Sequence, residues 1–296
     1  MKQFIKPLLF VFALLSTTTI ISQSKEIKLN LNKGDIFEFN TEMNTNIHQD
    51  MMGMKMNLSQ KYNVKLTVEV KDVLPNGDYL INQSYKRVVV EANTNGQTLN
   101  YDTNNSDTSS PLASIGNLKD AVVSYNLSPK GKVSKVKGLT EIGDLVGNNP
   151  QIKNMLKGIA NEKLLESTFL YIPEKKVDAG ANYSKTVVLE EFVDTKLVTK
   201  YTIESIDASS IHLSMSSRFD ISPDKPIVQN GMKMNMKGEG TQTGTLEVFR
   251  SSGMPKANDT KQKIEMTITM KNPQTDEDIT IPMKIETNVK TQVKKL

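Results

Sequence analysis

Apolar and polar residues alternate with a period of two along most of this chain, and the alternation limits what it can fold into. In the clearest run, Tyr62, Val64, Leu66, Val68 and Val70 share one face, and Lys, Asn, Thr and Glu residues occupy the other. Successive side chains of a strand point to opposite faces, so this run describes a strand with one buried and one solvated face. We therefore predict a mainly β protein with antiparallel strands.

Turn signals separate the alternating runs. Pro75–Asp78 and Asn95–Gly96 carry Asn and Gly, which accept the positive φ of tight turns, so each predicts a hairpin. The polar run 102–110 predicts a loop. The expected strands are 25–31, 37–43, 61–71, 79–91, 97–101, 122–127, 132–136, 197–206, 211–219, 232–236, 243–249, 264–270 and 279–293.

Internal similarity divides the chain into three parts. The pentapeptide Gly-Met-Lys-Met-Asn occurs at 53–57 and again at 231–235, and a weaker match at an offset of 135 residues preserves the order strand, turn, strand, Asn-Gly, strand. We predict two related antiparallel β-meander lobes, 25–101 and 180–296, that form a curved sheet or half-barrel. The middle segment 102–179 holds a loop, a hairpin and a helix.

Two helices are expected in the middle segment. Asn149 followed by Pro150 is a helix start, and Ile152, Met155 and Ile159 form one apolar stripe after it, so we predict an amphipathic helix over about 149–168. A shorter helix is expected over about 111–121. The ordinary role of an amphipathic helix here is to cover one face of the sheet.

The N-terminus has the pattern of a signal peptide. Lys2 and Lys6 precede the apolar run Leu8–Leu15, which is shorter than the roughly 20 residues that span a bilayer. We predict that residues 1–22 are a signal peptide and that the mature chain, which has no other membrane-spanning stretch, is periplasmic or secreted. Because the chain contains no cysteine, it has no lipobox cysteine, and disulfides and thiolate chemistry are excluded.

Few residues offer catalytic or binding chemistry. The formal charge of +4 and the lack of a basic stripe argue against nucleic acid as a partner. His48 and His212 occur in no nucleophile or metal motif, and Gly238-x-Gly240-x-x-x-Gly244, expected between two strands, lacks the ending of a phosphate loop. The run 276–278 reads as a solvated hairpin tip. We expect no enzyme activity, no cofactor and no metal site.

The chain is rich in methionine, with 15 residues, and it contains no tryptophan. Methionine is the one side chain with distinctive chemistry that the composition favours. Most of these residues fall on the apolar faces of the expected strands, which fits a Met-rich core or the lining of a cavity for variable apolar ligands. A Cu(I) site is the third interpretation, since thioethers are soft ligands. The candidate lining residues are Met54, Met56, Met215, Met232, Met234, Met266, Met270 and Met283.

Three short sequence signatures make the chain similar to a known protein family. They are Tyr101-Asp102-Thr103, Ser128-Pro129-x-Gly131-x-Val133-x-x-Val136-x-Gly138, and Gly240-x-x-x-Gly244-x-Leu246-x-Val248 with Gly253-x-Pro255. On these the chain resembles a family of exported bacterial proteins of unknown function, from about Gly34 to the end. The resemblance implies fold and export, and no site residue. At fold level alone, a long meander with a covering helix is similar to periplasmic lipoprotein carriers of the LolA type.

These observations leave two functions open. The first is an exported, non-enzymatic envelope protein that binds an apolar or lipid-like small molecule between a curved sheet and its helix. The alternative is a structural or interaction module of the envelope that binds a protein partner by strand addition. Cu(I) binding and an enzyme are the less favoured interpretations.

Overall fold

A computed structural model describes residues 26–51, 53–105, 109–110, 112–119, 121–138, 162–189, 195–222, 226–229, 232–272, 275 and 277–296. The strands are β1 (Ile36–Met51), β2 (Met54–Val73), β3 (Tyr79–Thr94), β4 (Gln97–Asp102), β5 (Val122–Leu127), β6 (Val133–Lys137), β7 (Asn182–Leu189), β8 (Thr195–Ile206), β9 (Ser210–Ile221), β10 (Ile227–Gln229), β11 (Met232–Phe249), β12 (Pro255–Lys271) and β13 (Asp278–Lys295). The helices are the 3-10 helix η1 (Ala113–Leu118) and α3 (Glu162–Ser167). The expectation of a mainly β protein is confirmed.

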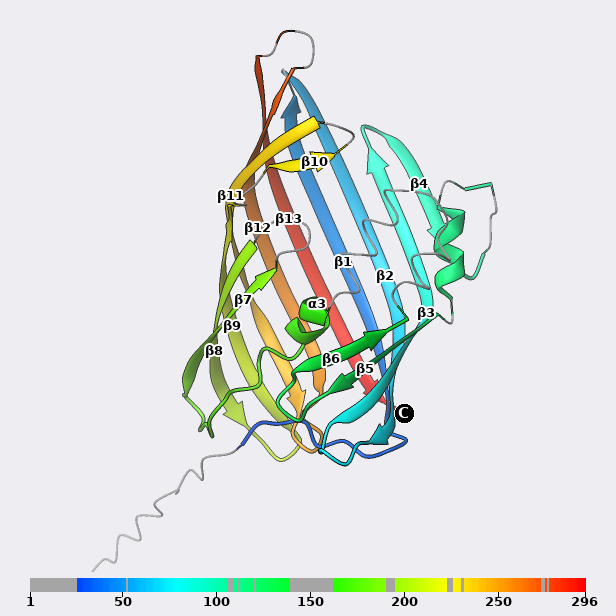
Figure 1. Ribbon diagram of the computed structural model, residues 1–296, viewed down its shortest axis with the longest axis vertical. Coiled ribbons are helices and arrows are strands. Elements are labelled where there is room, and N and C mark those ends of the chain that lie inside the picture. The colour runs from blue at the N-terminus through cyan, green and yellow to red at the C-terminus, as the bar shows by residue number, and fades with distance from the viewer. Residues whose placement is uncertain are drawn as a thin grey trace, which may run out of the picture.

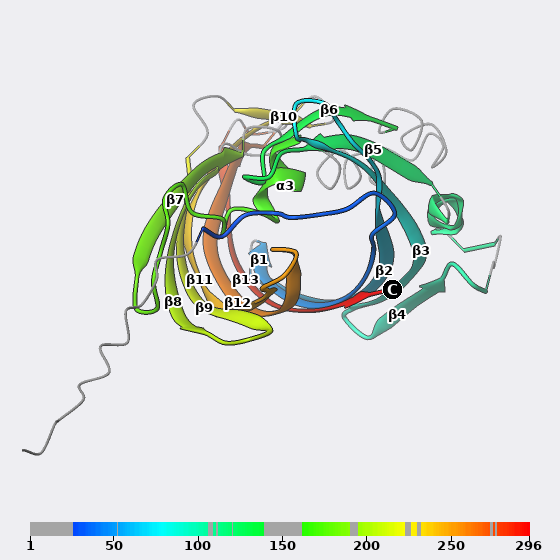
Figure 2. The same ribbon diagram turned by 90° about the horizontal axis from the view of Figure 1, so that it is seen from below.

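All of these strands belong to one curved antiparallel sheet. The 13-stranded sheet has the order β6-β5-β3-β2-β1-β13-β12-β11-β9-β8-β7, with β4 beside β3 and β10 beside β11. It curls strongly but does not close into a barrel (Figures 1 and 2). α3 contacts both edge strands, β6 and β7, so the helix lies across the gap between the two edges.

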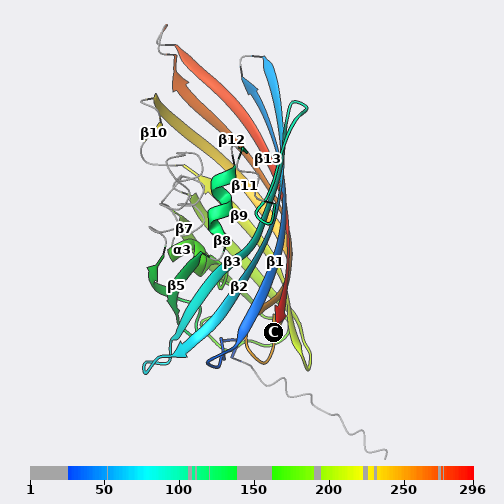
Figure 3. The same ribbon diagram turned by 90° about the vertical axis from the view of Figure 1, so that its right-hand side faces the viewer.

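The two halves of the chain occupy two sectors of this sheet. β1 to β6 form one sector and β7 to β13 the other, and the first and last strands join them, from Phe37 opposite Lys295 to Gln49 opposite Met283. Figure 3 shows these long strands running the length of the molecule. The expected lobes are therefore continuous in one sheet, and their relatedness by duplication stays a prediction.

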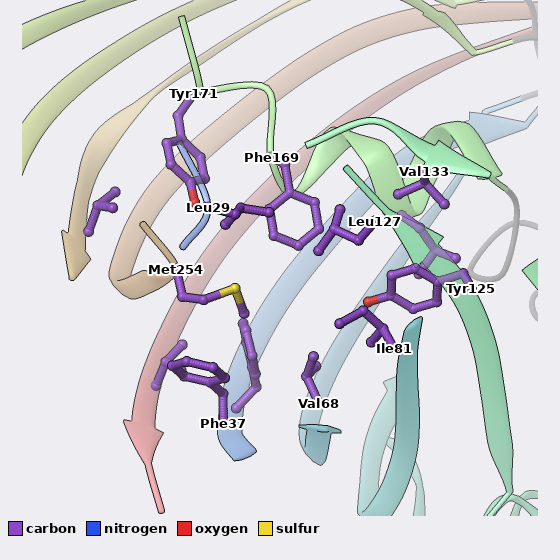
Figure 4. Packing of buried hydrophobic residues seen from close by; sticks show 14 of the residues in the cluster. Leu29, Phe37, Val68, Ile81, Tyr125, Leu127, Val133, Phe169, Tyr171 and Met254 are labelled. Carbon is purple, nitrogen blue, oxygen red and sulfur yellow. The ribbon is translucent and has the colours of Figure 1, made fainter. Parts of the chain in front are cut away.

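The inner face of the sheet is apolar and holds the core, as the alternation predicts. Phe37, Val70, Ile81, Leu213 and Val248 are nearly inaccessible to solvent, whereas the outer face carries Lys, Glu, Asn and Thr side chains. Figure 4 shows part of this core, around Phe37, Val68 and Met254. Each such buried apolar side chain stabilises the fold by roughly 1.5–3 kcal/mol relative to its exposed state.

The N-terminal segment 26–31 does not form the strand that its alternation suggests. It crosses the lower opening of the curled sheet (Figure 2) and buries Ile27, Leu29 and Leu31. Its backbone bonds go to two loops: the Leu29 N–H donates to the Pro129 carbonyl at 2.8 Å, and the Asn30 N–H donates to the Ser252 carbonyl at 2.8 Å. The segment alternates because one side faces the core, and it closes that end of the molecule.

A single strand replaces the two that were expected at 232–236 and 243–249. β11 runs through Gly238, Gly240 and Gly244, which all lie on its inner face. A Cβ atom at these positions would come within 2.6, 2.6 and 2.3 Å, respectively, of backbone oxygens of β12. The glycines therefore permit a tight bend between β11 and β12 that a side chain would prevent. This bend helps the sheet to curl.

The structure describes all of one predicted helix region's core turn and only the final part of the other. The short helix expected at 111–121 is present as η1, with Ile115 and Leu118 buried in the core. Of the helix expected at 149–168, residues 149–161 lie outside the described residues. The final turns are present as α3, which buries Leu165.

Candidate functional site

A cavity of about 740 Å³ lies inside the curl of the sheet, bounded by η1 and by α3 with the residues that follow it. This volume falls within the roughly 300–1,000 Å³ of small-molecule sites. The residues around it are mostly inward-facing members of alternating strands, so their exposure to the cavity follows from the same period-two pattern that forms the core.

One wall of the cavity is mainly apolar. It consists of inward-facing residues of β2 and β3 together with η1 and α3, including Val64, Leu66, Val88, Ile115 and Leu165. Val88 is opposite Val64 across the β2–β3 ladder, which places these side chains in one continuous surface. An apolar ligand placed against this wall would remove both surfaces from water.

The opposite wall carries uncharged polar groups. β8, β9, β11 and β12 contribute Thr199, Ser217, Gln242 and Asn258. The hydroxyls of Thr199 and Ser217, both buried, lie 2.9 Å apart and share a hydrogen bond. Oδ1 of Asn258 is buried and has no hydrogen-bond partner among the described residues, which is unusual because buried polar atoms are normally paired.

A hydrogen-bonded segment after α3 closes the lower end of the cavity. Phe169 and Tyr171 point into the core there, next to Leu29 and Met254 (Figure 4). The Tyr171 hydroxyl donates to the carbonyl oxygen of Gly253. These contacts join the helix connection, the N-terminal segment and the β11–β12 turn.

The described lining of the cavity is uncharged. None of its described lining residues is Asp, Glu, Lys, Arg or His. Burial raises the pKa of the tyrosines at its wall: Tyr62 and Tyr201 through burial alone, and Tyr125 through burial reinforced by the neighbouring Tyr85. These phenols therefore stay uncharged and can only offer hydrogen bonds.

The part of the chain from β3 into β12 contains most of this cavity, and a family model matches residues 76–255. The chain belongs to the family of unknown function DUF6263. No curated protein matches this DUF6263 member. Among the described residues, no helix is long and apolar enough to cross a membrane.

Solved structures resemble the DUF6263 fold at low identity. A lipovitellin structure, described by its lipid–protein interactions, matches with a TM-score of 0.50 and 11% identity over 90% of this chain and 25% of the other. The chain thus spans about a quarter of that lipovitellin chain, and the likeness concerns the fold alone. OccK5 of Pseudomonas aeruginosa (6% identity, 88% and 98% coverage) and an outer membrane channel of Pseudomonas putida F1 (7%, 90% and 97%) each have a TM-score of 0.24 and support no conclusion.

The methionines suggested as ligand lining are distributed along the inner face of this DUF6263 sheet. Met215 lines the cavity, while Met266 and Met283 border a separate hollow whose charged side chains, such as Lys196 and Arg218, belong to the outer face. Met234 and Met270 are opposite each other on β11 and β12, beyond the cavity.

The remaining suggested methionines lie at the far end of the sheet. Met54 is 66% exposed at the β1–β2 hairpin, and Met56 is half-buried and accepts a hydrogen bond from Gln49 at 3.3 Å. The side chain of Met232 lies outside the described residues. A ligand-binding role for any of these methionines, Met215 included, stays a prediction.

The histidines lie away from the cavity. His48 Nδ1 is 2.6 Å from Oδ1 of Asn57 on the outer face of the sheet, opposite to the face that holds Met56. His212 Nε2 is 3.0 Å from Oδ2 of Asp207 at the exposed β8–β9 turn. Sequence reasoning did not find this His–Asp pair. In the part of the chain described, no group of three or more His, Asp or Glu residues could hold a metal ion.

Sequence reasoning also missed the polar residues of the cavity lining, which include members of β1 and β2. Thr41 and Thr45 fall on the same face of β1 as Phe37 and Phe39, and Gln60 falls on the face of β2 that holds Val64. A search for polar residues at apolar-face positions would have found them. Their neighbours across the sheet follow only from the strand register.

Proposed function

We propose that this protein is an exported, non-enzymatic protein of the cell envelope that binds an apolar or lipid-like ligand between its curved sheet and α3. The observation that carries the proposal is the cavity of about 740 Å³, whose described lining is uncharged and whose β2–β3 wall is mainly apolar. Protein interiors are normally close-packed, so a hollow of this size inside the core calls for an occupant.

Four further observations support this function. Lipovitellin, which shares the fold, is described by its lipid–protein interactions. The signal-peptide pattern at residues 1–22 favours export, and the absence of cysteine removes thiol chemistry from the functions to consider. The histidines stand at the outer face or an exposed turn, which favours binding over catalysis.

The direct test is to recover the ligand. The chain, expressed with its own leader and purified without detergent, is analysed by native mass spectrometry and by organic extraction. We expect a bound hydrophobic species that native spraying retains and extraction releases. A protein that is free of ligand, and that takes up none from a total lipid extract, would rule the proposal out.

Two matched tryptophan variants localise the binding. Val64→Trp fills the cavity from β2, whereas Val198→Trp adds the same bulk to the outer face of β8, where Val198 is 37% exposed. We expect the first variant to lose most of the recovered ligand and the second to retain it. Equal ligand content in the two variants would show that the ligand binds elsewhere.

The second candidate function is an interaction module. It is favoured by the edge strand β7, which pairs with β8 alone among the described strands and carries the exposed Val188. An added strand from a partner would satisfy the free backbone groups of this edge. Cross-linking in the envelope followed by a pull-down tests it, and the lack of any reproducible partner would reject it.

A further inference from the structure

A row of polar side chains crosses the inner face of the sheet. Residues opposite one another in successive strands from β8 to β1 are polar at every position: Thr199, Ser217, Gln242, Gln262, Thr287 and Thr45. We call these residues the polar row. The neighbouring rows are mainly apolar, so the polar row is a distinct feature of the inner face.

The polar row has unused hydrogen-bonding capacity. Two pairs within it, Thr199 with Ser217 and Thr45 with Thr287, share hydrogen bonds of 2.9 and 3.1 Å. In a hydroxyl pair one group donates and the other accepts, so one proton in each pair stays available for a further acceptor. Thr199, Ser217 and Thr45 line the cavity, which makes a ligand oxygen the natural acceptor.

Nearby groups extend this capacity toward donors as well as acceptors. Thr41 and Thr291 form a third hydroxyl pair, at 3.0 Å, and both line the cavity. Asn258, opposite Thr291, has the buried Oδ1 that lacks a partner. A ligand with a hydroxyl group seated against this wall would supply the missing donor, and its oxygen would accept from the free protons.

Charge decides which amphiphiles fit. The described cavity lining contains no ionised side chain, and Lys185, which is opposite Thr199 on the edge strand β7, is ion-paired with Glu174. A carboxylate or phosphate buried here would lose its hydration without gaining a counter-charge, which is far more costly than burying a hydroxyl or an ester that is hydrogen-bonded.

Building on the proposed ligand-binding function, we infer that the ligand is an uncharged amphiphile. Its apolar body lies against β2, β3, η1 and α3. Its hydroxyl, ester or carbonyl oxygens bind the polar row and the hydroxyl pair beside it. Fatty acids and phospholipids, which carry a negative charge or a phosphate, are the classes that this cavity rejects.

Three probes with the same 18-carbon chain length test the inference: 1-oleoylglycerol, oleate and 1-octadecene. Each is delivered from cyclodextrin to the full, delipidated protein at pH 8, where oleate is ionised, and binding is measured by calorimetry. We expect 1-oleoylglycerol to bind about tenfold or more tightly than the other two, as one or two additional neutral hydrogen bonds would give.

The outcomes separate this inference from the proposed function. If oleate binds as tightly as 1-oleoylglycerol, the uncharged class is wrong although the cavity still holds lipid. If 1-octadecene binds as tightly, the polar row takes no part in recognition and the inference fails. If none of the probes binds, the proposed function fails with it.

Variants of the polar row give an independent readout. Thr199→Val combined with Ser217→Ala removes both partners of one pair, so neither is left unpaired. We expect about fivefold weaker binding of 1-oleoylglycerol and unchanged binding of 1-octadecene, because one neutral hydrogen bond is lost. Ser216→Ala, on the exposed outer face of β9 next to Ser217, is the matched control. It should change the affinity for neither 1-oleoylglycerol nor 1-octadecene. An unchanged affinity for 1-oleoylglycerol in the double variant would overturn the assignment.

A second variant, which should gain affinity for oleate, keeps the inference testable if the double variant does not fold. Gln242 is half-buried in the cavity wall, and Gln242→Lys adds an ammonium group there. We expect the ratio of oleate to 1-oleoylglycerol affinity to rise at least about tenfold, since a charged pair replaces a neutral contact. An unchanged ratio would show that the polar end of the ligand does not lie against this wall.

Discussion

Replacing Gly253 by alanine should detach the N-terminal segment from the lower end of the sheet. Gly253 has φ of +71°, and a Cβ there would lie 2.1 Å from the carbonyl oxygen of Lys28. Ordinary contact begins at 3.4 Å, so the segment would have to retreat by 1.3 Å. Such a shift breaks the 2.8 Å backbone bond from Asn30 to Ser252 and loosens the packing of Leu29.

Gly34 provides a matched control for the magnitude. Its φ is +89°, but a Cβ there would meet nothing within 4 Å. Gly34→Ala should therefore cost only the strain of a left-handed residue, about 1–2 kcal/mol. Gly253→Ala bears the same strain, and in addition it overpacks the site by about 1–3 kcal/mol and loses the backbone hydrogen bond. We therefore expect it to lower the free energy of unfolding by about 2 kcal/mol or more beyond the loss in Gly34→Ala.

Urea unfolding followed by far-UV circular dichroism gives both free energies of unfolding. Trypsin cleavage after Lys28 reports the segment directly, and it should accelerate in Gly253→Ala and not in Gly34→Ala. If the two variants lose the same stability within about 0.5 kcal/mol, which is the usual limit of additivity, the packing of the N-terminal segment against this turn is not as described.

Three further perturbations test the core, the helix connection and the charged surface. Phe37→Ala should cost about 3–5 kcal/mol of unfolding free energy, whereas Val198→Ala on the outer face should stay within about 0.5 kcal/mol; similar values in chemical denaturation would contradict the inner-face core. Tyr171→Phe leaves a buried backbone oxygen without its donor and should cost about 1–3 kcal/mol in the same assay, and a neutral result would mean that this hydroxyl bond is absent. Hydrogen bonds from Lys130 and Lys28 lower the pKa of Glu26 to about 2, so its stabilising contribution is complete above pH 4.5 and is lost as the pH falls through about 2. The stability difference between wild type and Glu26→Gln should therefore shrink over that range, and a difference that does not change with pH would reject the ion pair.

Local alternation was sufficient to predict most strands. Runs such as 79–91 and 122–127 appear as β3 and β5 with nearly the same limits, because each has an apolar face that only the sheet interior can cover. The hairpins at Pro75–Asp78 and Asn95–Gly96 also form where expected, with positive φ at Gly77 and Gly96.

Alternation failed where a residue's partner decides its structure. Residues 26–31 look like a strand, yet their backbone bonds go to loops. The glycines of β11 look like an interruption, yet they allow a bend against β12 that is visible only once that neighbour is known. Pro282 stands within β13, where a proline cannot donate a ladder hydrogen bond. It lies one residue beyond the last β1–β13 pair, so β13 is unpaired on that side there.

The candidate site was predictable only in outline. The sequence indicated a ligand held between a curved sheet and a helix, but it drew attention to methionines, which are conspicuous by composition. The polar row consists of common residues in separate strands, from Thr199 to Thr45, and only the register brings them into line. Long-range register depends on which strands pair, and pairing between distant strands leaves no local signal.

The pairing of β1 with β13 has a consequence for how the chain folds. The hydrogen bond between Thr41 and Thr291 joins residues 250 positions apart, so the two sectors cannot be joined before the final strand is available. Contacts of such long separation make folding slow, and until they form, β1 and β12 present open edges to other chains. A chain that crosses a membrane unfolded would meet this delay on arrival. A chaperone that covers these edges until β13 is in place would then prevent them from pairing with other chains.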